Sequence, residues 1–475
     1  MDIKIKLNNM KYRYDVYQIF NIYYNLYEIK FVDDNWNVKV DIYDNEMSID
    51  DGLNVKTYCI TNIEYKRWIK KNLFSYLKYK TKKELPWGSL IGIRPSKIAL
   101  SLIEKGKNRE EIIKYFHENY LAAENKAKLC INIANMEKSI VNKEKNKISI
   151  YIGMPFCPTR CLYCSFASNP IGKCSKLVEP YLKALYYEMK SLSKYIKEKN
   201  LKVQSVYFGG GTPTSIDNNQ FEETLKNIYL NFLKDYNIEE FTVEAGRPDS
   251  ITFEKLLSMK KYNVNRISIN PQTMNDITLK NIGRTHTVED TKSIFNLARK
   301  LGFDDINMDI IVGLPGEGLK EVKNTCKEIL NLKPDNLTVH GMSIKRGSIL
   351  HEKLLNNIEF KVPEQNELNL MYNETLELSK KMNMNPYYMY RQKNMIGNME
   401  NIGYCKGENL GLYNIQMIEE KQTIIAIGAD AVSKIIFLDE NRIERVPNVK
   451  DVREYIKRVE EMVNRKISML NTLYV

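Results

Sequence analysis

Long apolar runs are absent from this sequence of 475 residues: no stretch of eighteen consecutive apolar residues occurs, so no membrane-spanning helix is predicted. The first ten residues, MDIKIKLNNM, lack the apolar core of a secretory signal, and we expect a cytoplasmic protein. Cysteine is scarce, and eight residues in a chain of this length are too few for a disulfide-rich secreted scaffold. With 43% hydrophobic and 10% aromatic residues, the chain still has the apolar surface for a packed core, which excludes a disordered or collagen-like protein.

Neither sign of charge dominates the sequence. Lys and Arg number 71 and Asp and Glu 59, which leaves a net charge of +12. The basic residues are dispersed through predicted helices instead of forming runs, so we interpret them mainly as a solvated surface and expect no nucleic-acid partner. The excess remains compatible with an acidic substrate.

Residues 1–146 predict an N-terminal α+β accessory domain. Short runs in which apolar and polar residues alternate, such as YRYDVYQIF, YNLYEIKFV and WNVKVDIY, precede residue 60 and predict a small antiparallel sheet. Beyond Asn62 the apolar residues recur at spacings of three and four, as on one face of a helix. Further helices are predicted over 95–105, 108–119 and 122–142. The charged run KEKNK then marks a boundary.

From residue 147 the sequence alternates short β-branched runs with amphipathic helices. Six strands are predicted, over 148–153, 205–210, 240–246, 266–270, 306–313 and 337–342. Helices are predicted between them, near 176–199, 218–234, 252–261, 288–301 and 318–331. This alternation predicts an α/β fold with a parallel sheet, and a length of about 200 residues suits an open (β/α)6 barrel, a partial TIM barrel, over 147–345. Residues 346–475 predict a C-terminal α+β cap, with helices near 364–383 and 450–470.

Three cysteines crowd into the first predicted βα loop: Cys157, Cys161 and Cys164, with the spacing CxxxCxxC. Thiolates at this spacing can hold three irons of a [4Fe–4S] cluster and leave the fourth iron open to another ligand. A structural zinc site is the alternative interpretation. Such sites use four protein ligands, and the spare candidates Cys174 and His286 are poorly placed in the sequence.

A glycine-rich loop, GGGTPT, spans residues 209–214 and follows the second predicted strand. Glycines lack a Cβ, so the backbone N–H groups of such a loop can approach a ligand closely. The loop is neither GxGxxG nor a P-loop, so nucleotide phosphates are not its expected target. Four polar residues follow or end later strands: Glu244, Gln272, Arg284 and Asp309. Because the carboxyl ends of parallel strands meet on one rim, we expect these side chains to share a site with the cysteines.

The motifs CxxxCxxC, GGGTPT and NxDxIxGLP, in this order, resemble those of the radical S-adenosylmethionine (SAM) enzymes of the oxygen-independent coproporphyrinogen III oxidase family. The resemblance covers roughly residues 147–435. Three further segments, GIRPSK (92–97), YRQKNM (390–395) and EEKQTIIAIGADAVSK (419–434), are similar to the HemZ-type coproporphyrinogen dehydrogenases of that family.

The resemblance implies that Cys157, Cys161 and Cys164 bind a [4Fe–4S] cluster whose open iron takes the amino and carboxylate groups of SAM. The family pattern implies that SAM is contacted by Tyr151 at the sulfonium, Phe166 at the adenine, Gly210, Gly211 and Thr212 along the methionine, and also Glu244, Gln272, Arg284, Asp309 and Ser343. Of these, Tyr151, Arg284 and Asp309 would take part in catalysis. The resemblance further implies a reducing electron donor such as flavodoxin or ferredoxin.

The implied reaction is the oxygen-independent oxidative decarboxylation of coproporphyrinogen III to protoporphyrinogen IX in haem biosynthesis, by a 5′-deoxyadenosyl radical. Its substrate is a tetrapyrrole that bears propionates, and arginine suits carboxylates well. We hypothesise that some of four cations contact the propionates: Arg94, Lys97, Arg160 and Arg391. His340, at the end of a predicted strand, is a candidate for proton handling.

Two departures from the family pattern leave alternatives open. The well-characterised dehydrogenases carry another cysteine two residues after the third ligand, where this chain has Phe166, and in this loop the chain resembles the related haem chaperones. Those chaperones carry a His–Asn and Tyr–Trp signature after the barrel, whereas this chain has no His after His351 and no Trp after Trp87. The alternatives are a haem chaperone that retains the cluster, or another radical SAM reaction on a tetrapyrrole. Cys174 and Cys405 are candidates to replace the missing cysteine.

Overall fold

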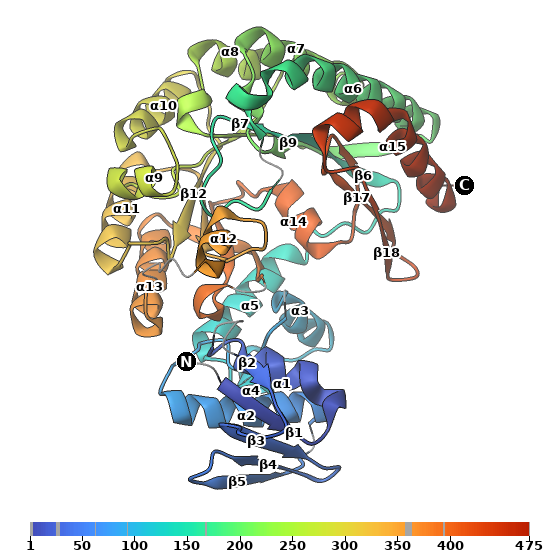
Figure 1. Cartoon of the computed structure of the whole chain (residues 1–475). Helices are drawn as coiled ribbons and strands as arrows, with labels where there is room; N and C mark the ends of the chain where they lie inside the picture. The colour runs from blue at the N-terminus through green and yellow to red at the C-terminus, as the bar shows by residue number, and fades with distance from the viewer. Residues whose placement is uncertain are drawn as a thin grey trace. The chain divides into compact units, whose positions relative to one another are not determined.

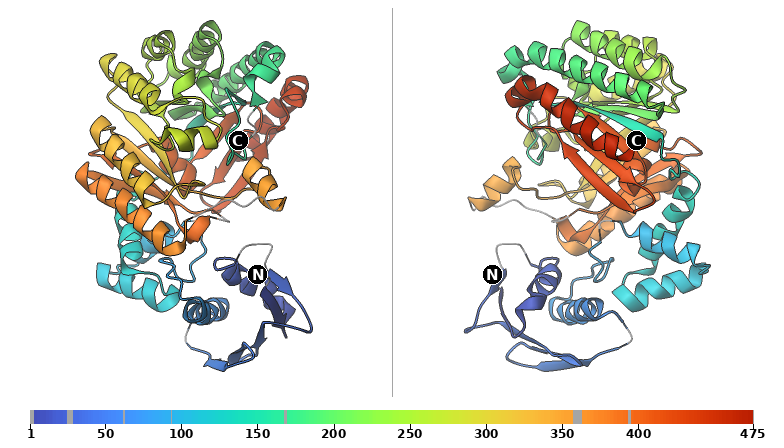
Figure 2. Two further views of the ribbon diagram at one scale, coloured as in Figure 1. Left: turned by 60° about the vertical axis from the view of Figure 1, so that its left-hand side comes forward. Right: turned by 90° about the vertical axis from the view of Figure 1, so that its right-hand side faces the viewer.

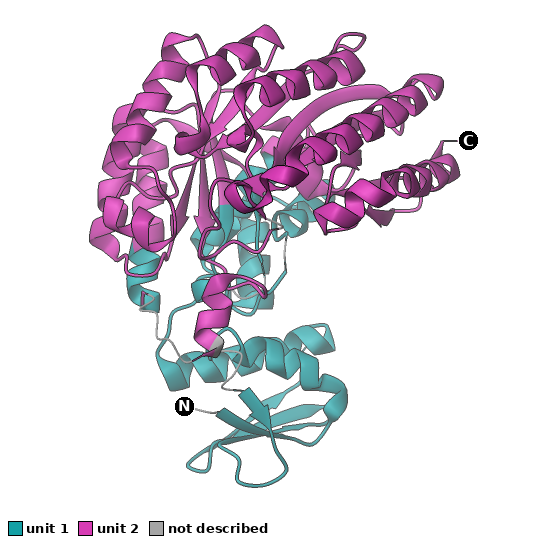
Figure 3. Ribbon diagram, turned by 45° about the horizontal axis from the view of Figure 1, so that its top comes forward, with its two compact units in different colours: residues 1–135, 364–370, 389–401 teal, residues 136–363, 371–388, 402–475 magenta. Residues whose placement is uncertain are grey.

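The computed structural model describes residues 3–24, 29–61, 63–92, 94–166, 169–356, 363–392 and 395–474. The chain divides into two compact units (Figure 3). Unit 1 comprises Met1–Asn135, Glu364–Leu370 and Met389–Asn401, and unit 2 comprises Met136–Pro363, Met371–Tyr388 and Ile402–Val475. Several residues of the segments named above lie outside the described ranges: residues 25–28 of YNLYEIKFV, Ile93 of GIRPSK, and Lys393 and Asn394 of YRQKNM. Among the helices that are described, none has both the length and the apolar character needed to cross a membrane.

Unit 1 contains a five-stranded sheet in the order β2-β1-β3-β4-β5. Its strands are β1 (Ile3–Leu7), β2 (Ile29–Phe31), β3 (Val38–Ile42), β4 (Glu46–Asp50) and β5 (Val55–Cys59). The antiparallel prediction is confirmed for β3, β4 and β5 but is wrong for β1, which pairs in parallel with both neighbours. The run YRYDVYQIF, predicted as a strand, contains the helix α1 (Arg13–Phe20), whose buried Val16, Ile19 and Phe20 follow helical spacing. Because α1 carries the chain back between β1 and β2, these strands can pair in parallel.

The helices of unit 1 match the predicted segments. They are α2 (Tyr65–Thr81), α3 (Ser96–Glu104), α4 (Arg109–Tyr120) and α5 (Glu124–Glu137), the last of which ends in unit 2. α2 buries Trp68, Leu73 and Leu77 in the same core as the apolar face of the sheet. α4 begins at a capping box, in which Asn108 accepts a hydrogen bond from the backbone N–H of Glu111 and the Glu111 side chain accepts one from Asn108.

Unit 2 is built on a sheet whose central six strands are the predicted ones. They are β6 (Lys147–Met154), β9 (Lys202–Gly210), β10 (Glu240–Gly246), β11 (Arg266–Ile269), β12 (Ile306–Val312) and β13 (Asn336–Gly341). Each pairs in parallel with the next in chain order, so the predicted α/β class and parallel sheet are confirmed. The helices between the strands form an outer arc, with the strands on its inner side (Figure 1). They are α6 (Ile171–Glu198), α7 (Asn218–Ile228), α8 (Phe253–Lys261), α9 (Asp276–Asn281), α10 (Val288–Lys300) and α11 (Leu319–Leu332).

Strands from the last quarter of the chain extend this sheet at both edges. At one edge, β16 (Thr423–Ile427) pairs in parallel with β6 and is followed by the antiparallel strands β17 (Val432–Phe437) and β18 (Arg442–Pro447). At the other edge, β15 (Asn401–Lys406) pairs antiparallel with β13, and β14 (Met384–Tyr390) lies beyond it. The full order is β14-β15-β13-β12-β11-β10-β9-β6-β16-β17-β18. The strand that precedes the cysteine loop is therefore an interior strand, flanked by β9 and β16.

The remaining helices are α12 (Ile349–Leu355), α13 (Gln365–Lys381), α14 (Leu412–Glu419) and α15 (Val452–Leu473). α15 packs along α6 (Figure 2), and the contact encloses an ion pair between Glu188 and Lys466 whose side chains are both fully buried. The Tyr455 hydroxyl donates to Glu188 over 2.6 Å and the Gly428 backbone N–H donates over 2.8 Å. These donors offset the cost of burying the carboxylate, which would otherwise be several kcal/mol.

Candidate functional site

The loop that carries Cys157, Cys161 and Cys164, which we call the cysteine loop, follows the carboxyl end of β6. Backbone hydrogen bonds anchor it to segments far away in the sequence. A short strand, β7 (Phe156–Cys157), pairs with β8 (Asn169–Pro170). The Leu162 N–H donates to the Ile282 carbonyl over 2.9 Å, and the Leu162 carbonyl accepts from the Leu350 N–H over 2.9 Å. Cys157 and Cys161 are buried, while Cys164 is partly exposed. The loop thus holds its three thiols at the rim formed by the strand ends.

The three thiols do not converge on one point as the ligands of a single metal ion would. Within the described ranges, no three Cys, His, Asp or Glu side chains converge closely enough to hold one metal ion. A four-iron cluster binds each thiolate at a different iron, which is a wider arrangement. Of the two thiols named as possible substitutes for the missing cysteine, Cys174 lies at a non-helical position where α6 kinks, and Cys405 lies in β15.

The glycine-rich loop packs directly on the cysteine loop. A Cβ on Gly210, whose φ is +112°, would lie 2.7 Å from backbone atoms of Met154, and one on Gly211 would lie 2.9 Å from the Cys157 Sγ. The N–H groups of Gly211 and Thr212 donate to the carbonyls of Met154 and Phe156 over 2.6 and 2.8 Å. The glycines are therefore required for contact between two loops of the chain itself; their predicted contact with a ligand stays a prediction.

Five side chains from five strands of the sheet form what we call the inner wall. They are two tyrosines, two carboxyl groups and a histidine: Tyr151, Tyr207, Glu244, Asp309 and His340. The rings of Tyr151 and Tyr207 stack with their centroids 6.1 Å apart. All five side chains are partly buried and keep some accessible surface, as expected for groups that face an internal space. Burial and the charge of Asp309 raise the pKa of Glu244 to about 7. This carboxyl group can therefore hold or release a proton near neutral pH.

Asp309 and His340 form the second part of the inner wall. Their Oδ2 and Nε2 atoms lie 3.5 Å apart, and Asp309 Oδ1 accepts a hydrogen bond of 2.7 Å from the Asn307 amide. Burial alone would raise the pKa of Asp309, but the interactions with His340 and Asn307 outweigh it and lower that pKa. Two carboxyl groups on one wall thus differ in character, since Asp309 is held ionised and Glu244 is poised to titrate.

The other predicted residues extend the site along the rim, with one exception. Gln272 and Arg284 are buried, and in the described structure Gln272 Oε1 and Arg284 Nε have no hydrogen-bond partner. Arg284 lies beside Cys161, and its Nη1 donates to the Asn270 carbonyl over 2.5 Å. Ser343 is buried just beyond the end of β13. Phe166 is the exception, because its ring is 64% exposed and its contact is the Lys345 ammonium, 5.4 Å from the ring centroid.

Two residues at this site were not singled out from the sequence. Arg247, 3% exposed, follows the end of β10 by one residue and lies against Cys161. The rule that βα loops carry function could have identified it. Tyr413 comes from α14, and its ring centroid lies 4.5 Å from that of Tyr207. No sequence signal identifies Tyr413, because it is brought there from a segment more than two hundred residues further along the chain.

The four cations suggested for propionates differ in their surroundings. Arg391 is 3% exposed, and its guanidinium donates to the carbonyls of Leu90 over 2.5 Å and of Asn398 over 2.8 Å. Arg94 and Lys97 belong to unit 1, as Arg391 does, and Arg160 belongs to unit 2. Arg160 lies within the cysteine loop, where its Nη2 donates to the Gly347 carbonyl. The guanidinium of Arg391 therefore serves the packing of unit 1.

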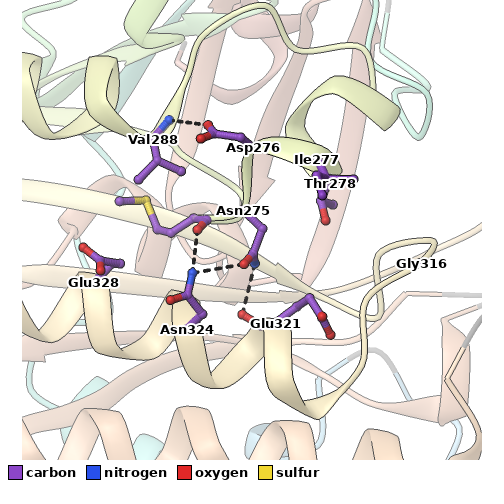
Figure 4. A pocket seen from close by; sticks show the side chains of 10 residues that line it. Asn275, Asp276, Ile277, Thr278, Val288, Gly316, Glu321, Asn324 and Glu328 are labelled. Carbon is purple, nitrogen blue, oxygen red and sulfur yellow. Dashed lines mark hydrogen bonds between the residues drawn. The ribbon is translucent and has the colours of Figure 1, made fainter.

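A cavity of about 530 Å³ lies away from these residues, between α9 and α11 (Figure 4). Its polar groups bind one another: the Asn324 amide donates to the Met274 carbonyl over 2.9 Å, and the Val288 N–H donates to Asp276 over 2.8 Å. None of the predicted site residues lines it. The cavity is thus separate from the candidate site.

Comparisons with known proteins converge on one family. The model of the radical SAM superfamily matches residues 151–329. The chain is 42% identical over 391 residues to the oxygen-independent coproporphyrinogen-III oxidase-like protein HemZ of Bacillus subtilis. The aligned region covers 82% of this chain and 77% of that protein. The chain is 33% identical over 224 residues to the haem chaperone HemW of the same organism, covering 47% of this chain and 58% of the chaperone. The solved structure of coproporphyrinogen III oxidase (HemN) from Escherichia coli, described as a radical SAM enzyme, superposes on this chain with a TM-score of 0.53 at 20% identity. The superposition covers 70% of this chain and 73% of that one, so the two share a fold.

Proposed function

The chain belongs to the radical SAM superfamily, in the group of oxygen-independent coproporphyrinogen-III oxidase-like proteins, and from that premise we propose that it catalyses the oxygen-independent oxidative decarboxylation of coproporphyrinogen III to protoporphyrinogen IX. The observation that carries the proposal is the position of three anchored thiols beside a polar inner wall at one rim of a parallel sheet. The similarity to HemZ over most of both chains supports the choice of reaction within the superfamily. We take the six parallel strands as the open (β/α)6 barrel of residues 147–345, between an accessory domain (1–146) and a cap (346–475).

The donors around the thiols fit an iron–sulfur cluster. The Thr212 hydroxyl lies 3.5 Å from the Cys157 Sγ, and the Arg247 Nη1 lies 3.8 Å from the Cys161 Sγ. Hydroxyl and guanidinium donors stabilise the anionic thiolates that hold such a cluster. Cys157, Cys161 and Cys164 would therefore be its ligands.

The polar groups of the rim fit SAM, which carries an ammonium, a sulfonium and a carboxylate. Glu244 and Asp309 offer negative charge to the two cationic groups, and the Arg284 guanidinium offers its positive charge and its unpartnered Nε to the carboxylate. Buried polar atoms without a partner are uncommon in proteins, and three in this part of the described structure, Gln272 Oε1, Arg284 Nε and Arg160 Nε, support the presence of a ligand there. Tyr151, Gly210, Gly211, Thr212 and Ser343 complete the proposed contacts, and Phe166 would reach the adenine from the exposed rim.

When bound, the cluster and SAM supply one-electron chemistry and the removal of hydrogen from a propionate side chain. The residues of the chain itself shield and orient the reaction. Tyr151 and Tyr207 form an aromatic wall, and Tyr413 closes it from the amino end, where Glu240 accepts the backbone N–H of Leu412 over 2.5 Å. Asp309 Oδ2 lies 3.5 Å from His340 Nε2 and would orient that imidazole, and Glu244 can take up or release a proton near neutral pH. Arg160 is the proposed contact for a substrate propionate, because it lies on the cysteine loop itself.

The direct test is anaerobic turnover. The full chain is reconstituted with iron and sulfide and incubated with SAM, a chemical reductant and coproporphyrinogen III, and the products are resolved by mass. The expected result is a tetrapyrrole that has lost two CO2 groups, together with 5′-deoxyadenosine. Failure to form either product with an intact cluster would overturn the reaction, and failure to bind iron and sulfide would overturn the whole proposal.

A haem chaperone is the second candidate, supported by the 33% identity to HemW and by Phe166 in place of a further cysteine after Cys164. The same preparation distinguishes the two. Stoichiometric haem binding with no decarboxylated product supports the chaperone, whereas turnover supports the enzyme. A different radical reaction on a tetrapyrrole would be seen as 5′-deoxyadenosine with a product of another mass.

A further inference from the structure

Arg247 follows β10, and hydrogen bonds hold its guanidinium in place against the cysteine loop. Its Nη1 donates to the Thr159 hydroxyl over 3.0 Å and lies 3.8 Å from the Cys161 Sγ. Its Nε and Nη2 donate to the two oxygens of Asp249 over 3.0 and 2.7 Å, and Nη2 also donates to the Thr285 hydroxyl over 3.2 Å. A planar fork bound at five points has little freedom to turn away from the sulfur.

The partners of Arg247 are themselves held. The Thr159 hydroxyl donates to the Gly283 carbonyl over 2.7 Å, and the Thr285 hydroxyl donates to Asp249. Burial would raise the pKa of Asp249, but His286, Arg247 and Thr285, which face the carboxylate, outweigh burial and keep that pKa well below its ordinary value. The carboxylate therefore stays ionised and keeps the guanidinium aligned.

The three thiols differ in what faces them. Cys157 faces the neutral hydroxyl of Thr212, and Cys164 is partly exposed near the Lys345 ammonium. Cys161 is buried and faces the guanidinium of Arg247, and the guanidinium of Arg284 interacts with it as well. A positive donor next to a buried sulfur favours added negative charge there, because the surroundings screen the attraction weakly. Hydrogen bonds to cluster sulfurs are one of the means by which proteins set cluster potentials.

We propose that Arg247 is a positioning residue that donates to the Cys161 thiolate of the [4Fe–4S] cluster and raises the cluster's reduction potential. The inference rests on the proposed function, since it requires the cluster. The step it affects is a one-electron transfer from a low-potential donor of the flavodoxin or ferredoxin class, in which the donor is oxidised and the cluster gains one negative charge. The guanidinium stabilises that extra charge, so the reduced cluster is more accessible to the donor than it would be beside a neutral side chain.

The test is a redox titration of the reconstituted full chain, in which dithionite supplies electrons and the signal of the reduced cluster is followed by electron paramagnetic resonance. The main variant is R247M/D249N, which replaces the ion pair by neutral groups of similar size and leaves no unpaired charge. We expect reduction to become about tenfold less favourable, which is about 59 mV for one electron. Arg247→Lys keeps the charge without the fork, and we expect it to lie between the wild type and the double variant.

The matched control is R266M/D305N. Arg266 is also 3% exposed and pairs with its carboxylate over 2.9 Å, but it lies at the amino end of β11, away from the thiols. We expect the potential of this control to equal that of the wild type. If R247M/D249N does not fold, the comparison of Arg247→Lys with the wild type decides. Potentials that agree among all variants would overturn the role of Arg247 and leave the proposed function standing, whereas a wild-type chain that takes up no cluster would overturn both.

Discussion

The two ends of the same parallel sheet treat their buried polar groups differently. At the amino ends, Arg266 pairs with Asp305 over 2.9 Å and the Gln422 amide donates to Gln204 over 2.7 Å, although Asn336 Oδ1 has no partner in the described structure. At the carboxyl ends, Gln272 Oε1 and Arg284 Nε have no partner in the described structure, and the pKa of Glu244 is raised to about 7. Polar groups that satisfy each other maintain a fold, whereas buried groups without partners on one rim indicate a ligand. Residues of the first kind serve stability, and residues of the second kind on the carboxyl rim are the candidates for function.

The sharpest test of this comparison removes one thiol from the rim. Cys161→Ala should abolish the visible absorbance of the reconstituted cluster, because two remaining ligands cannot hold it, while far-ultraviolet circular dichroism stays unchanged. Cys326→Ala is the matched control, because Cys326 is also buried but lies on α11. Retention of the full absorbance in Cys161→Ala would show that this cysteine is not a ligand.

The next largest effect is expected at the opposite end of the sheet. Arg266→Met should lower the free energy of unfolding by about 3 kcal/mol, because it leaves the Asp305 carboxylate without its cation. Urea denaturation measures this, and R266M/D305N should recover part of the loss. SAM affinity of the folded variant should be unchanged, and a large loss of affinity would mean that the two ends are not functionally separate.

A smaller effect of opposite sign is expected on the inner wall. The pKa of Glu244 is raised by folding to about 7, so the folded state binds this proton more tightly than the unfolded state does. The carboxyl group therefore costs stability progressively as the pH rises from about 4.5 to 7, and fully above that range. Glu244→Gln should stabilise the cofactor-free protein at pH 8 by roughly 1–3 kcal/mol, since one pKa unit corresponds to about 1.4 kcal/mol.

The control for the Glu244→Gln prediction is the same stability measurement at pH 4. At pH 4 the wild-type carboxyl group is protonated in both states, so the wild type and Glu244→Gln should have nearly equal stability in urea. A gain of stability that is the same at pH 4 and pH 8 would show that the substitution acts through packing, and Glu244 would then resemble the structural residues of the amino ends.

The smallest effect is expected from Phe166, which the structure leaves exposed at the rim. Phe166→Ala should change the free energy of unfolding by less than about 0.5 kcal/mol, because an exposed ring contributes little to the core. If the ring contacts the adenine, equilibrium dialysis should show SAM binding several-fold more weakly. Unchanged binding would remove Phe166 from the site and confine the comparison to the buried rim.

The six strands of the parallel sheet could be predicted because each is a short β-branched run between amphipathic helices. The helix in the run YRYDVYQIF could not be predicted. Its alternation of apolar and polar residues fits a strand, the spacing of Val16, Ile19 and Phe20 fits a helix, and only packing decides between the two. The thiols and the glycine loop were recognisable as motifs, although how they would be used was not: Gly211 packs on Cys157 itself. The position of Arg247 against Cys161 joins residues 86 apart and depends on loop conformation, which no local pattern encodes.

The pairing of β16 with β6 has a consequence for how this protein is made. Tyr151 on β6 is paired with Ala426 on β16, and these residues leave the ribosome 275 residues apart. Until β16 emerges, β6 keeps one open edge, which can pair wrongly with another chain. The cysteine loop that follows β6 is anchored by Ile282 and Leu350, which emerge before β16, so the late step is the closing of the β6 edge. A chain truncated before Thr423 is therefore expected to aggregate through the open edge of β6 instead of acquiring a cluster.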